Sequence, residues 1–248
     1  MCGRFSQERP ASELAEIFAA EPLAEELGPR WNVAPTDEAF VVVQRQERRA
    51  IVAYRWGLIP HWAEDAKVAS RMFNARSESL SRSPAFADAL RRKRCLVPVD
   101  GFYEWQRTAT RRQPFTIGRA DARPLALAGL WSGWRDPAKD VVVRTFSIVT
   151  TRPNDQLAWL HDRMPVIVPE AAWDQWLDPD LADLGELHGL FEPTDEIALR
   201  IEPVADLVNN VRNDGPELVV PIDPAEVDRA ERAARGPEPL GLFDEVSR

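Results

Sequence analysis

Cysteine and long apolar runs are what this sequence has least of. Only Cys2 and Cys95 occur in 248 residues, which excludes a disulfide scaffold and a zinc site built from several thiolates. No apolar run approaches the roughly 18 residues that cross a bilayer, and residues 1–9 do not resemble a secretion signal. We therefore expect no metal, no cofactor, no membrane contact and a cytoplasmic, nucleoid-associated location.

Positive charge is also scarce, because 31 basic residues stand against 40 acidic ones and give a net charge of -9. This balance excludes a protein that coats nucleic acid through bulk charge. Basic residues nevertheless outnumber acidic ones between residues 71 and 94, so the chain can still carry a basic groove. The run Arg91-Arg92-Lys93-Arg94 is interpreted as the solvated end of a helix, where cations complement the helix dipole.

Apolar residues follow helical spacing in a few segments and strand spacing in more. Helices are predicted over residues 11–20, from Ser83-Pro84 onward, and around Trp173, Trp176 and Leu177. Strands are predicted over residues 40–43, 51–56, 95–99, 115–117, 125–130, 141–150, 166–168 and 199–204. Since strands and helices do not alternate regularly, we expect an α+β fold with a curled, mainly antiparallel sheet and peripheral short helices.

One domain is the expected organisation for residues 1–222, because no repeat and no Gly/Ser linker divides them. From residue 223 the composition changes to Asp, Glu, Ala, Arg and Pro. We interpret residues 223–248 as an acidic C-terminal tail that is partly disordered. We expect the protein to be a monomer.

Cys2 is the most informative residue. Aminopeptidases remove Met1 when a small residue follows, so Cys2 is expected to become the mature N-terminus with its amine and thiol side by side. These groups titrate near 7.7–8.0 and 8.5, so at neutral pH part of each is nucleophilic without strong tuning. Such a 1,2-aminothiol captures an aldehyde as a Schiff base and closes it into a thiazolidine. Alternatively, Cys2 is an incidental small residue after the start codon.

Other segments carry side chains suited to the same chemistry. In Asn74-Ala75-Arg76-Ser77-Glu78, an extended backbone places Asn74 and Arg76 on one side, for orienting a polar group and pairing a phosphate. Glu104 lies among aromatic residues in Gly101-Phe102-Tyr103-Glu104-Trp105, which should raise its pKa. His161 offers a proton carrier. The alternatives are a turn residue for Asn74, an ion-pair partner for Glu104 and a polar cap for His161.

In this order the segments resemble the SRAP family, the SOS response-associated peptidase-like proteins that recognise abasic sites in single-stranded DNA. The resemblance extends over nearly all of residues 1–222. It rests on Met1-Cys2-Gly3-Arg4-Phe5, Trp31-Asn32-Val33-Ala34-Pro35, Trp56-Gly57, the Asn74 and Glu104 segments, Ile148-Val149-Thr150, His161-Asp162-Arg163-Met164-Pro165 and Asn210-Val211-Arg212-Asn213. It implies an α+β domain around a positively charged groove, and a thiazolidine link between Cys2 and a ring-opened abasic site.

The resemblance also implies a role for individual residues. Cys2 is the nucleophile, Asn74 positions the sugar or the amine, Glu104 assists the Schiff-base chemistry, His161 transfers protons at the sugar hydroxyl, and Thr150 adds a hydroxyl. The implied DNA contacts are Arg4, Arg76 and Arg163 to phosphates, with Pro35 and Trp62 as apolar wedges. The sequence departs from the family at His61-Trp62, where two aromatic residues often occur. Cys95 matches no motif and is expected in the core.

Two other functions are compatible with the sequence. A thiol peptidase or autopeptidase would use Cys2 with Glu104 and His161, and would need the thiolate but no free amine. A DNA-binding adaptor would recruit a partner through its tail. There, Leu240, Leu242 and Phe243 resemble the peptides that dock into the bacterial sliding clamp, although Pro239 replaces the usual leading glutamine.

Overall fold

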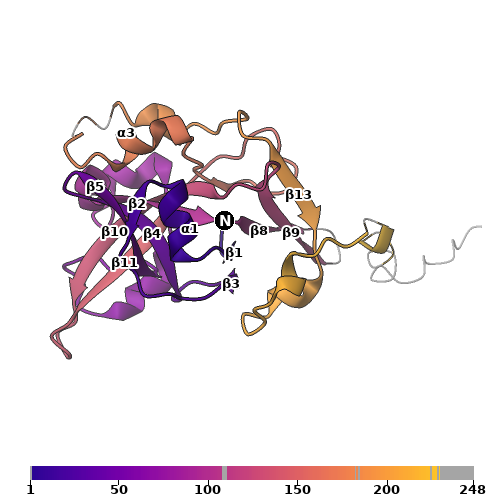
Figure 1. Ribbon diagram of the computed structural model, residues 1–248, viewed down its shortest axis with the longest axis horizontal. Helices are drawn as coiled ribbons and strands as arrows, with labels where there is room; N and C mark the ends of the chain where they lie inside the picture. Colours follow the sequence, from indigo (N-terminus) through magenta and orange to yellow (C-terminus); the bar gives the residue numbers. More distant parts are fainter. Residues whose placement is uncertain are drawn as a thin grey trace, which may run out of the picture.

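Two β-sheets and a set of short helices make up the structure, a computed structural model that describes residues 2–107, 111–181, 183, 185–223, 225–227 and 229 (Figure 1). Its strands are β1 (Phe5–Gln7), β2 (Ala20–Pro22), β3 (Arg30–Val33), β4 (Glu38–Arg45), β5 (Arg48–Trp56), β6 (Asn74–Arg76), β7 (Arg94–Val99), β8 (Gly101–Arg107), β9 (Arg112–Arg119), β10 (Leu125–Arg135), β11 (Val142–Thr151), β12 (Met164–Pro165) and β13 (Leu199–Pro203). The α-helices are α1 (Ala11–Ile17), α2 (Ala87–Arg92) and α3 (Trp173–Leu177), and 3-10 helices span η1 (Ala66–Arg71), η2 (Ser77–Arg82), η3 (Glu170–Ala172), η4 (His188–Phe191), η5 (Asp206–Asn209) and η6 (Pro216–Val219).

The larger sheet curls into a partial barrel. Its strands follow the order β12-β11-β10-β7-β4-β5-β2, and β6 pairs with β11 outside this path. A short parallel pairing of Thr145 with Arg55 and of Phe146 with Trp56 joins β11 to β5. Because this contact spans only two residue pairs, β5 and β11 close the barrel at one place and lie apart beyond it. The smaller sheet, β13-β9-β8-β1-β3, is antiparallel throughout.

Strand alternation divides the core into two parts. On β4, Val41 and Val43 belong to the cluster inside the barrel, whereas Phe40 and Val42 belong to the cluster under the helices. This two-residue period is what a strand with two buried faces requires. Phe18, which follows α1, stacks on Trp173 of α3 at a centroid distance of 4.4 Å. The helices α1 and α3 therefore cover the outer face of the barrel with apolar side chains (Figure 1).

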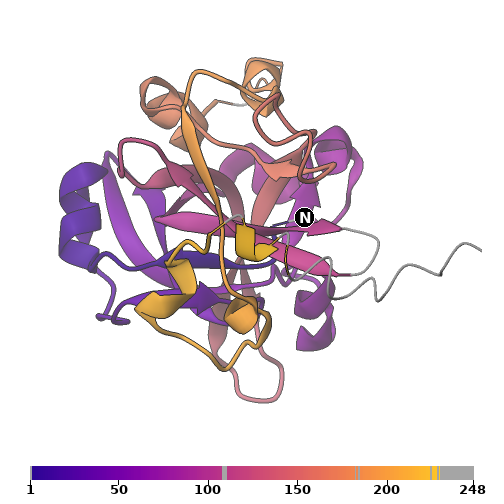
Figure 2. The ribbon, with the colours of Figure 1, turned by 90° about the vertical axis from the view of Figure 1, so that its right-hand side faces the viewer.

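The two ends of the described chain meet at the smaller sheet. In Figure 2 the late segments η5 and η6, drawn in gold, lie beside the indigo N-terminal strands. Arg4 donates a hydrogen bond to the Val208 carbonyl at 2.9 Å, and Asp214 accepts one from the Trp31 backbone N–H at 2.6 Å. These contacts fix the last 3-10 segments against β1 and β3.

Gly57 explains one of the sequence motifs. It follows β5 with φ of +120°, and a Cβ at this position would lie 2.6 Å from the Ala69 carbonyl oxygen. Its backbone N–H donates to the Phe146 carbonyl at 2.7 Å. Only glycine therefore fits where the chain leaves β5 beside β11.

The α+β fold with a curled, mainly antiparallel sheet is confirmed, and so are the helices beginning near residues 11 and 173. Three details differ. The second helix begins at Ala87, because Ser83 first accepts turn hydrogen bonds from Phe86 and Ala87. Residues 166–168 form only an isolated bridge, between Ile167 and Leu127. Arg94 is buried and not a solvated helix end, because it donates to backbone carbonyls, among them that of Trp176 at 2.6 Å.

Part of the predicted acidic tail, including Leu240, Leu242 and Phe243, lies outside the described residues. Sliding-clamp docking stays a prediction. Among the described residues, no helix is both long and apolar enough to span a membrane.

Candidate functional site

Cys2 lies just before β1 and is completely buried. Its carbonyl oxygen accepts a hydrogen bond of 2.7 Å from the Asn74 side-chain amide. Asn74 begins β6, which is held parallel to β11 with Asn74 opposite Ile148. The Asn74 Oδ1 atom is buried and has no hydrogen-bond partner among the described residues. Asn74 therefore fixes the backbone of Cys2 and keeps one acceptor available for a further donor.

Glu104 is the acid of the site. It lies on β8, the strand that pairs with β1 through Phe5 and Phe102, and it is 3% exposed. Burial raises the pKa of its carboxyl group, while the positive charge at the amino terminus, and His161 when its ring is protonated, oppose the shift. The sequence predicted a raised pKa, and the structure agrees. A carboxyl group of this kind can hold a proton near neutrality and give it to a reacting atom.

His161 faces Glu104 across a short gap. Its Nε2 atom is 3.8 Å from the Glu104 Oε2 atom. The Nδ1 atom accepts a hydrogen bond of 2.9 Å from the backbone N–H of Arg163. A neutral imidazole that accepts at Nδ1 carries its proton on Nε2, so this hydrogen bond directs the proton toward Glu104. Asp162 Oδ1, 2.9 Å from Nδ1, becomes an ion-pair partner when the ring is protonated.

Arg163 connects the end of β11 to η2. Its guanidinium donates to the Thr150 carbonyl at 2.6 Å, lies 3.3 Å from Thr150 Oγ1, and pairs with both carboxylate oxygens of Glu78. The Arg163 hydrogen bond lowers the pKa of Glu78. Arg163 therefore orders the segment beside His161, and its contact with a DNA phosphate stays a prediction.

Arg4, just before β1, is held by residues from distant parts of the chain. Its Nη1 atom donates to Asn32 Oδ1 at 3.1 Å and to the Val208 carbonyl at 2.9 Å. Asn32 is fully buried and donates in turn to the carbonyls of Asn210 and Asn213. Burial lowers the pKa of Arg4. Arg4 thus has protein partners of its own, as Arg163 has.

The remaining predicted DNA contacts are more accessible. Arg76 is exposed at the end of β6, and Trp62 exposes 56% of its surface. Pro35 is half-buried after β3. The structure brings Cys2, Asn74, Glu104 and His161 into one cluster, whereas it gives Arg76 and Trp62 no contact with that cluster among the described residues.

One sequence expectation about Cys2 is wrong. The thiol does not titrate near its ordinary value, because burial first and the negative charge of Glu104 second raise its pKa strongly. An aminothiol that titrates normally would need contact with solvent, but the fold encloses the sulfur. Its hydrogen-bond acceptor is the Arg4 carbonyl at 3.9 Å. The thiol at this site is therefore protonated near neutral pH, and a nearby base must remove its proton. Cys95 is buried in its strand, as expected.

Sequence reasoning missed the roles of Asn32, Glu78 and Asp214. Asn32 and Glu78 lie inside motifs that were recognised, but their partners Val208 and Arg163 lie far away in the sequence. Asp214 binds Arg30 and the backbone N–H groups of β3. Spacing alone does not reveal such contacts. No group of three or more His, Cys, Asp or Glu side chains able to hold a metal ion occurs in the described part of the chain.

Solved structures share this fold. A protein from Bacteroides thetaiotaomicron superposes with a TM-score of 0.82 at 23% identity, covering 90% of this chain and 100% of that one. A phage-related protein from Bordetella bronchiseptica gives a TM-score of 0.62 at 29% identity, covering 82% and 94%. The likeness extends over most of the chain, and the α+β fold is therefore shared with these proteins.

The sequence comparison agrees. The family model of the SOS response associated peptidase (SRAP) matches residues 1–211, and the chain belongs to this family. The abasic site processing protein YoqW of Bacillus subtilis (strain 168) is 36% identical over 222 residues, which cover 88% of this chain and 99% of the relative. The abasic site processing protein HMCES of Gallus gallus is 32% identical, covering 79% and 67%.

Proposed function

We propose that this protein processes abasic sites in single-stranded DNA by forming a covalent crosslink through Cys2. The observation that carries the proposal is the enclosure of Cys2 beside Glu104, with its backbone fixed by Asn74. The names of the relatives as abasic site processing proteins support the substrate. The crosslink protects the lesion while it stays attached to the protein.

The proposed reaction starts after removal of Met1 and releases one water molecule. The Cys2 amine adds to the C1′ aldehyde of the ring-opened sugar, and the resulting hydroxyl leaves as water when Glu104 gives it a proton. The Schiff base that forms is then attacked by the thiol. A C–S bond forms at C1′, the C=N electron pair moves to nitrogen, and the thiol proton follows through the Glu104 carboxylate. The product is a thiazolidine.

The raised pKa values fit these roles. Burial favours the protonated form of Glu104, which can supply the proton of the first step, and its conjugate base then serves the protonated Cys2 thiol, whose pKa is also raised. The buried Asn74 Oδ1 atom accepts from the Cys2 amine and orients its lone pair. His161, with its proton on Nε2, opens the closed sugar by proton transfer, and Thr150 contributes a hydroxyl.

The DNA strand is proposed to approach from the side of the exposed residues. Arg76 and Trp62 offer an accessible cation and an accessible aromatic ring, and Pro35 provides a rigid apolar edge. Arg4 and Arg163 contribute positive charge from within their networks. Phosphate contacts of this kind position the strand without reading its sequence.

The test is crosslinking to an oligonucleotide with one abasic site, followed by denaturing electrophoresis and mass spectrometry. Cys2→Ala should abolish the heat-stable product. Cys2→Ser keeps the amine, so borohydride should trap its Schiff base although the ring does not close. Cys95→Ala is the matched control, since it removes the other buried cysteine, and it should crosslink normally. A stable adduct with Cys2→Ala would show that another residue is the nucleophile.

A peptidase function of Cys2 with Glu104 and His161 stays a prediction. The raised pKa of the Cys2 thiol weighs against it, because a thiol peptidase needs the thiolate before substrate binds. The two functions differ in their need for the amine. Protein prepared with Met1 retained should lose crosslinking completely, whereas a peptidase acting on other substrates would keep its activity.

A further inference from the structure

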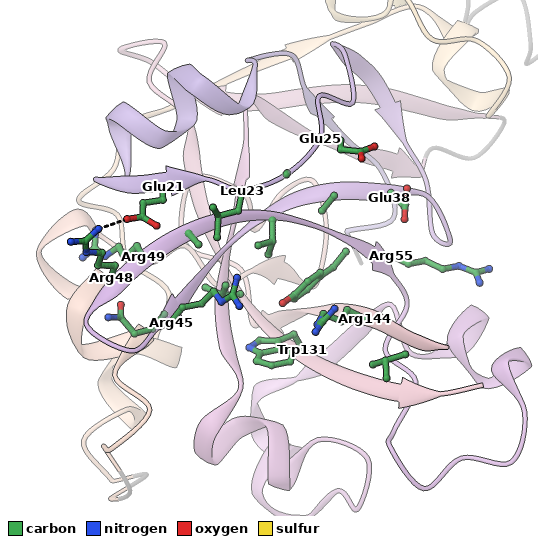
Figure 3. A pocket seen from close by; sticks show the side chains of 18 of the residues that line it. Glu21, Leu23, Glu25, Glu38, Arg45, Arg48, Arg49, Arg55, Trp131 and Arg144 are labelled. Atoms are coloured by element: carbon green, nitrogen blue, oxygen red, sulfur yellow. Dashed lines mark hydrogen bonds and ion pairs between the residues drawn. The ribbon is translucent and has the colours of Figure 1, made fainter. Parts of the chain in front are cut away.

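A large cavity opens at the end of the barrel, where β5 and β11 separate (Figure 3). Its volume is about 1610 Å³, and we call it the barrel-end pocket. It is lined by side chains of β4, β5, β10 and β11, and by the segment around β2. Arg144 lines the pocket near one end of β11, and Thr150 of the candidate site is six residues further along that strand. At about 3.3 Å per residue the two places are about 20 Å apart.

Two arginines carry the positive charge at the centre of the pocket. Figure 3 shows Arg45 and Arg144 on either side of Trp131. Neither guanidinium has a hydrogen bond or an ion pair within the described ranges of the chain. Burial raises the pKa of Tyr54 to about 12, and the charges of Arg144 and Arg45 both act against that shift. Both guanidinium charges therefore act on Tyr54, which also lines the pocket.

The other arginines of the pocket have partners. Arg48 pairs with Glu21, and Arg49 pairs with Asp174. Arg55 donates to the Thr36 carbonyl and lies directly opposite Glu38 in the sheet. Glu25 and Glu47 also line the pocket, and Figure 3 shows Glu25 away from the two central arginines. Among the arginines that line the pocket, Arg45 and Arg144 are thus the two that have no such partner in the described part of the chain.

Arg45 and Arg144 are both exposed, and their neighbours in the sheet favour an anion beside them. Arg45 lies directly opposite Arg48 in the β4–β5 hairpin, and like charges at opposite positions destabilise a sheet. Arg144 lies opposite Gly133 on β10, which has no side chain to occupy the space beside it. A phosphate between Arg45 and Arg144 would relieve the repulsion and accept charge-assisted hydrogen bonds.

An aromatic surface lies next to the two cations. Trp131 is only partly buried, and its ring packs at 49° to Tyr54 with a centroid distance of 5.6 Å. Tyr54 supports one part of the indole, and the open part is available for stacking. Aromatic rings of this kind bind nucleic-acid bases without regard to sequence. Two guanidinium groups beside an indole match the phosphate and the base of one nucleotide.

We infer that the barrel-end pocket is a second binding site, for a nucleotide, whose phosphate lies between Arg45 and Arg144 and whose base stacks on Trp131. The nucleotide is either free or part of a DNA strand, because both present the same phosphate and base. The site is separate from Cys2, so this inference does not rest on the proposed function.

The test is equilibrium dialysis of the full chain against dAMP and, separately, against inorganic phosphate. Arg45→Gln/Arg144→Gln should weaken dAMP binding by about tenfold or more, because two charged hydrogen-bonding groups are lost. Arg48→Gln/Arg55→Gln is the matched control, since it removes the same charge from the same pocket at occupied arginines. It should change the affinity little. Trp131→Leu should weaken dAMP binding but leave phosphate binding unchanged.

A second arm uses an undamaged oligothymidylate, to distinguish the two sources of the nucleotide. If Arg45→Gln/Arg144→Gln weakens both dAMP and oligonucleotide binding, the pocket holds part of the strand. If it weakens only dAMP binding, the pocket holds a free nucleotide. The inference is overturned if dAMP does not bind the wild-type protein saturably, if both double variants bind it equally, or if Trp131→Leu weakens phosphate binding as much as dAMP binding.

Discussion

Asn32→Ala tests whether the network around Arg4 holds the site together. The Asn32 side chain is fully buried. Its oxygen accepts from Arg4 at 3.1 Å, and its amide donates to the carbonyls of Asn213 at 2.9 Å and Asn210 at 3.1 Å. Alanine removes all of these hydrogen bonds at once. It leaves the Arg4 guanidinium with the Val208 carbonyl as its remaining partner among the described residues.

The expected loss follows from the contacts. Each neutral hydrogen bond contributes about 1 kcal/mol, and the bond to the charged Arg4 about 1.5–3 kcal/mol. Together they amount to about 4 kcal/mol, a large share of the roughly 5–15 kcal/mol that stabilises a typical domain. For a chain of this size the midpoint of thermal unfolding, Tm, should fall by roughly 8–16 °C.

Urea unfolding followed by tryptophan fluorescence measures the loss in the free energy of unfolding. Crosslinking at a temperature where the variant is still folded measures the effect on the site. Asn209→Ala is the matched control. Asn209 lies in the same region, and its side chain accepts one exposed hydrogen bond, from Trp105. This substitution should cost about 1 kcal/mol or less. If Asn32→Ala costs no more than Asn209→Ala, the network does not stabilise the fold and our reasoning is refuted.

Four further outcomes are expected. Glu104→Gln should slow crosslinking by about 100-fold or more with little change in noncovalent DNA affinity, and unchanged rates would remove Glu104 from the chemistry. Burial raises the pKa of Glu104 above its ordinary 4.5, so above pH 4.5 the unfolded protein loses this proton while the folded protein still holds it. The free energy of unfolding of the wild type, relative to that of Glu104→Gln, should therefore fall as the pH rises above 4.5. His161→Ala should slow both formation and reversal of the crosslink in time courses, and normal rates in both directions would make His161 structural. Arg76→Ala should reduce the salt dependence of single-strand binding by about 0.7 in log–log slope, whereas the equally exposed Arg91→Ala should not; equal slopes for both would place Arg76 outside the DNA path.

The spacing of apolar residues predicted much of the fold, because it indicates which faces of a helix or strand are buried. The alternation along β4 and the stripe of Trp173, Trp176 and Leu177 each identify an element correctly. The patterns fail where distant partners decide the outcome. Arg94 looks like a surface cation in sequence, yet it is buried because backbone carbonyls near the end of α3 accept its hydrogen bonds. The division of the strands between two sheets and the closure through β5 and β11 were not predicted.

The sequence motifs predicted that Cys2, Asn74, Glu104 and His161 act together, and the fold brings these residues into one cluster. The motifs did not predict the electrostatics of the cluster. Glu104 among aromatic residues indicated burial, and its pKa is raised as expected. The position of Cys2 near the start of the sequence gives no sign of its enclosure. Its burial depends on Asn74 and on the pairing of β1 with β8, which only the fold brings together.

The bond between Arg4 and Val208, residues separated by 204 positions, has a consequence for synthesis of the protein. A ribosome adds about 5–20 residues each second, so about 10–40 s pass between the emergence of the two partners. During that interval Cys2 has been synthesised but its partners have not. Asn74 is synthesised next, then Glu104 and His161, and last the segment that holds Arg4. The reactive residue is made first and its surroundings are completed last. The site that we propose for aldehyde capture is therefore complete only after residue 208 has left the ribosome.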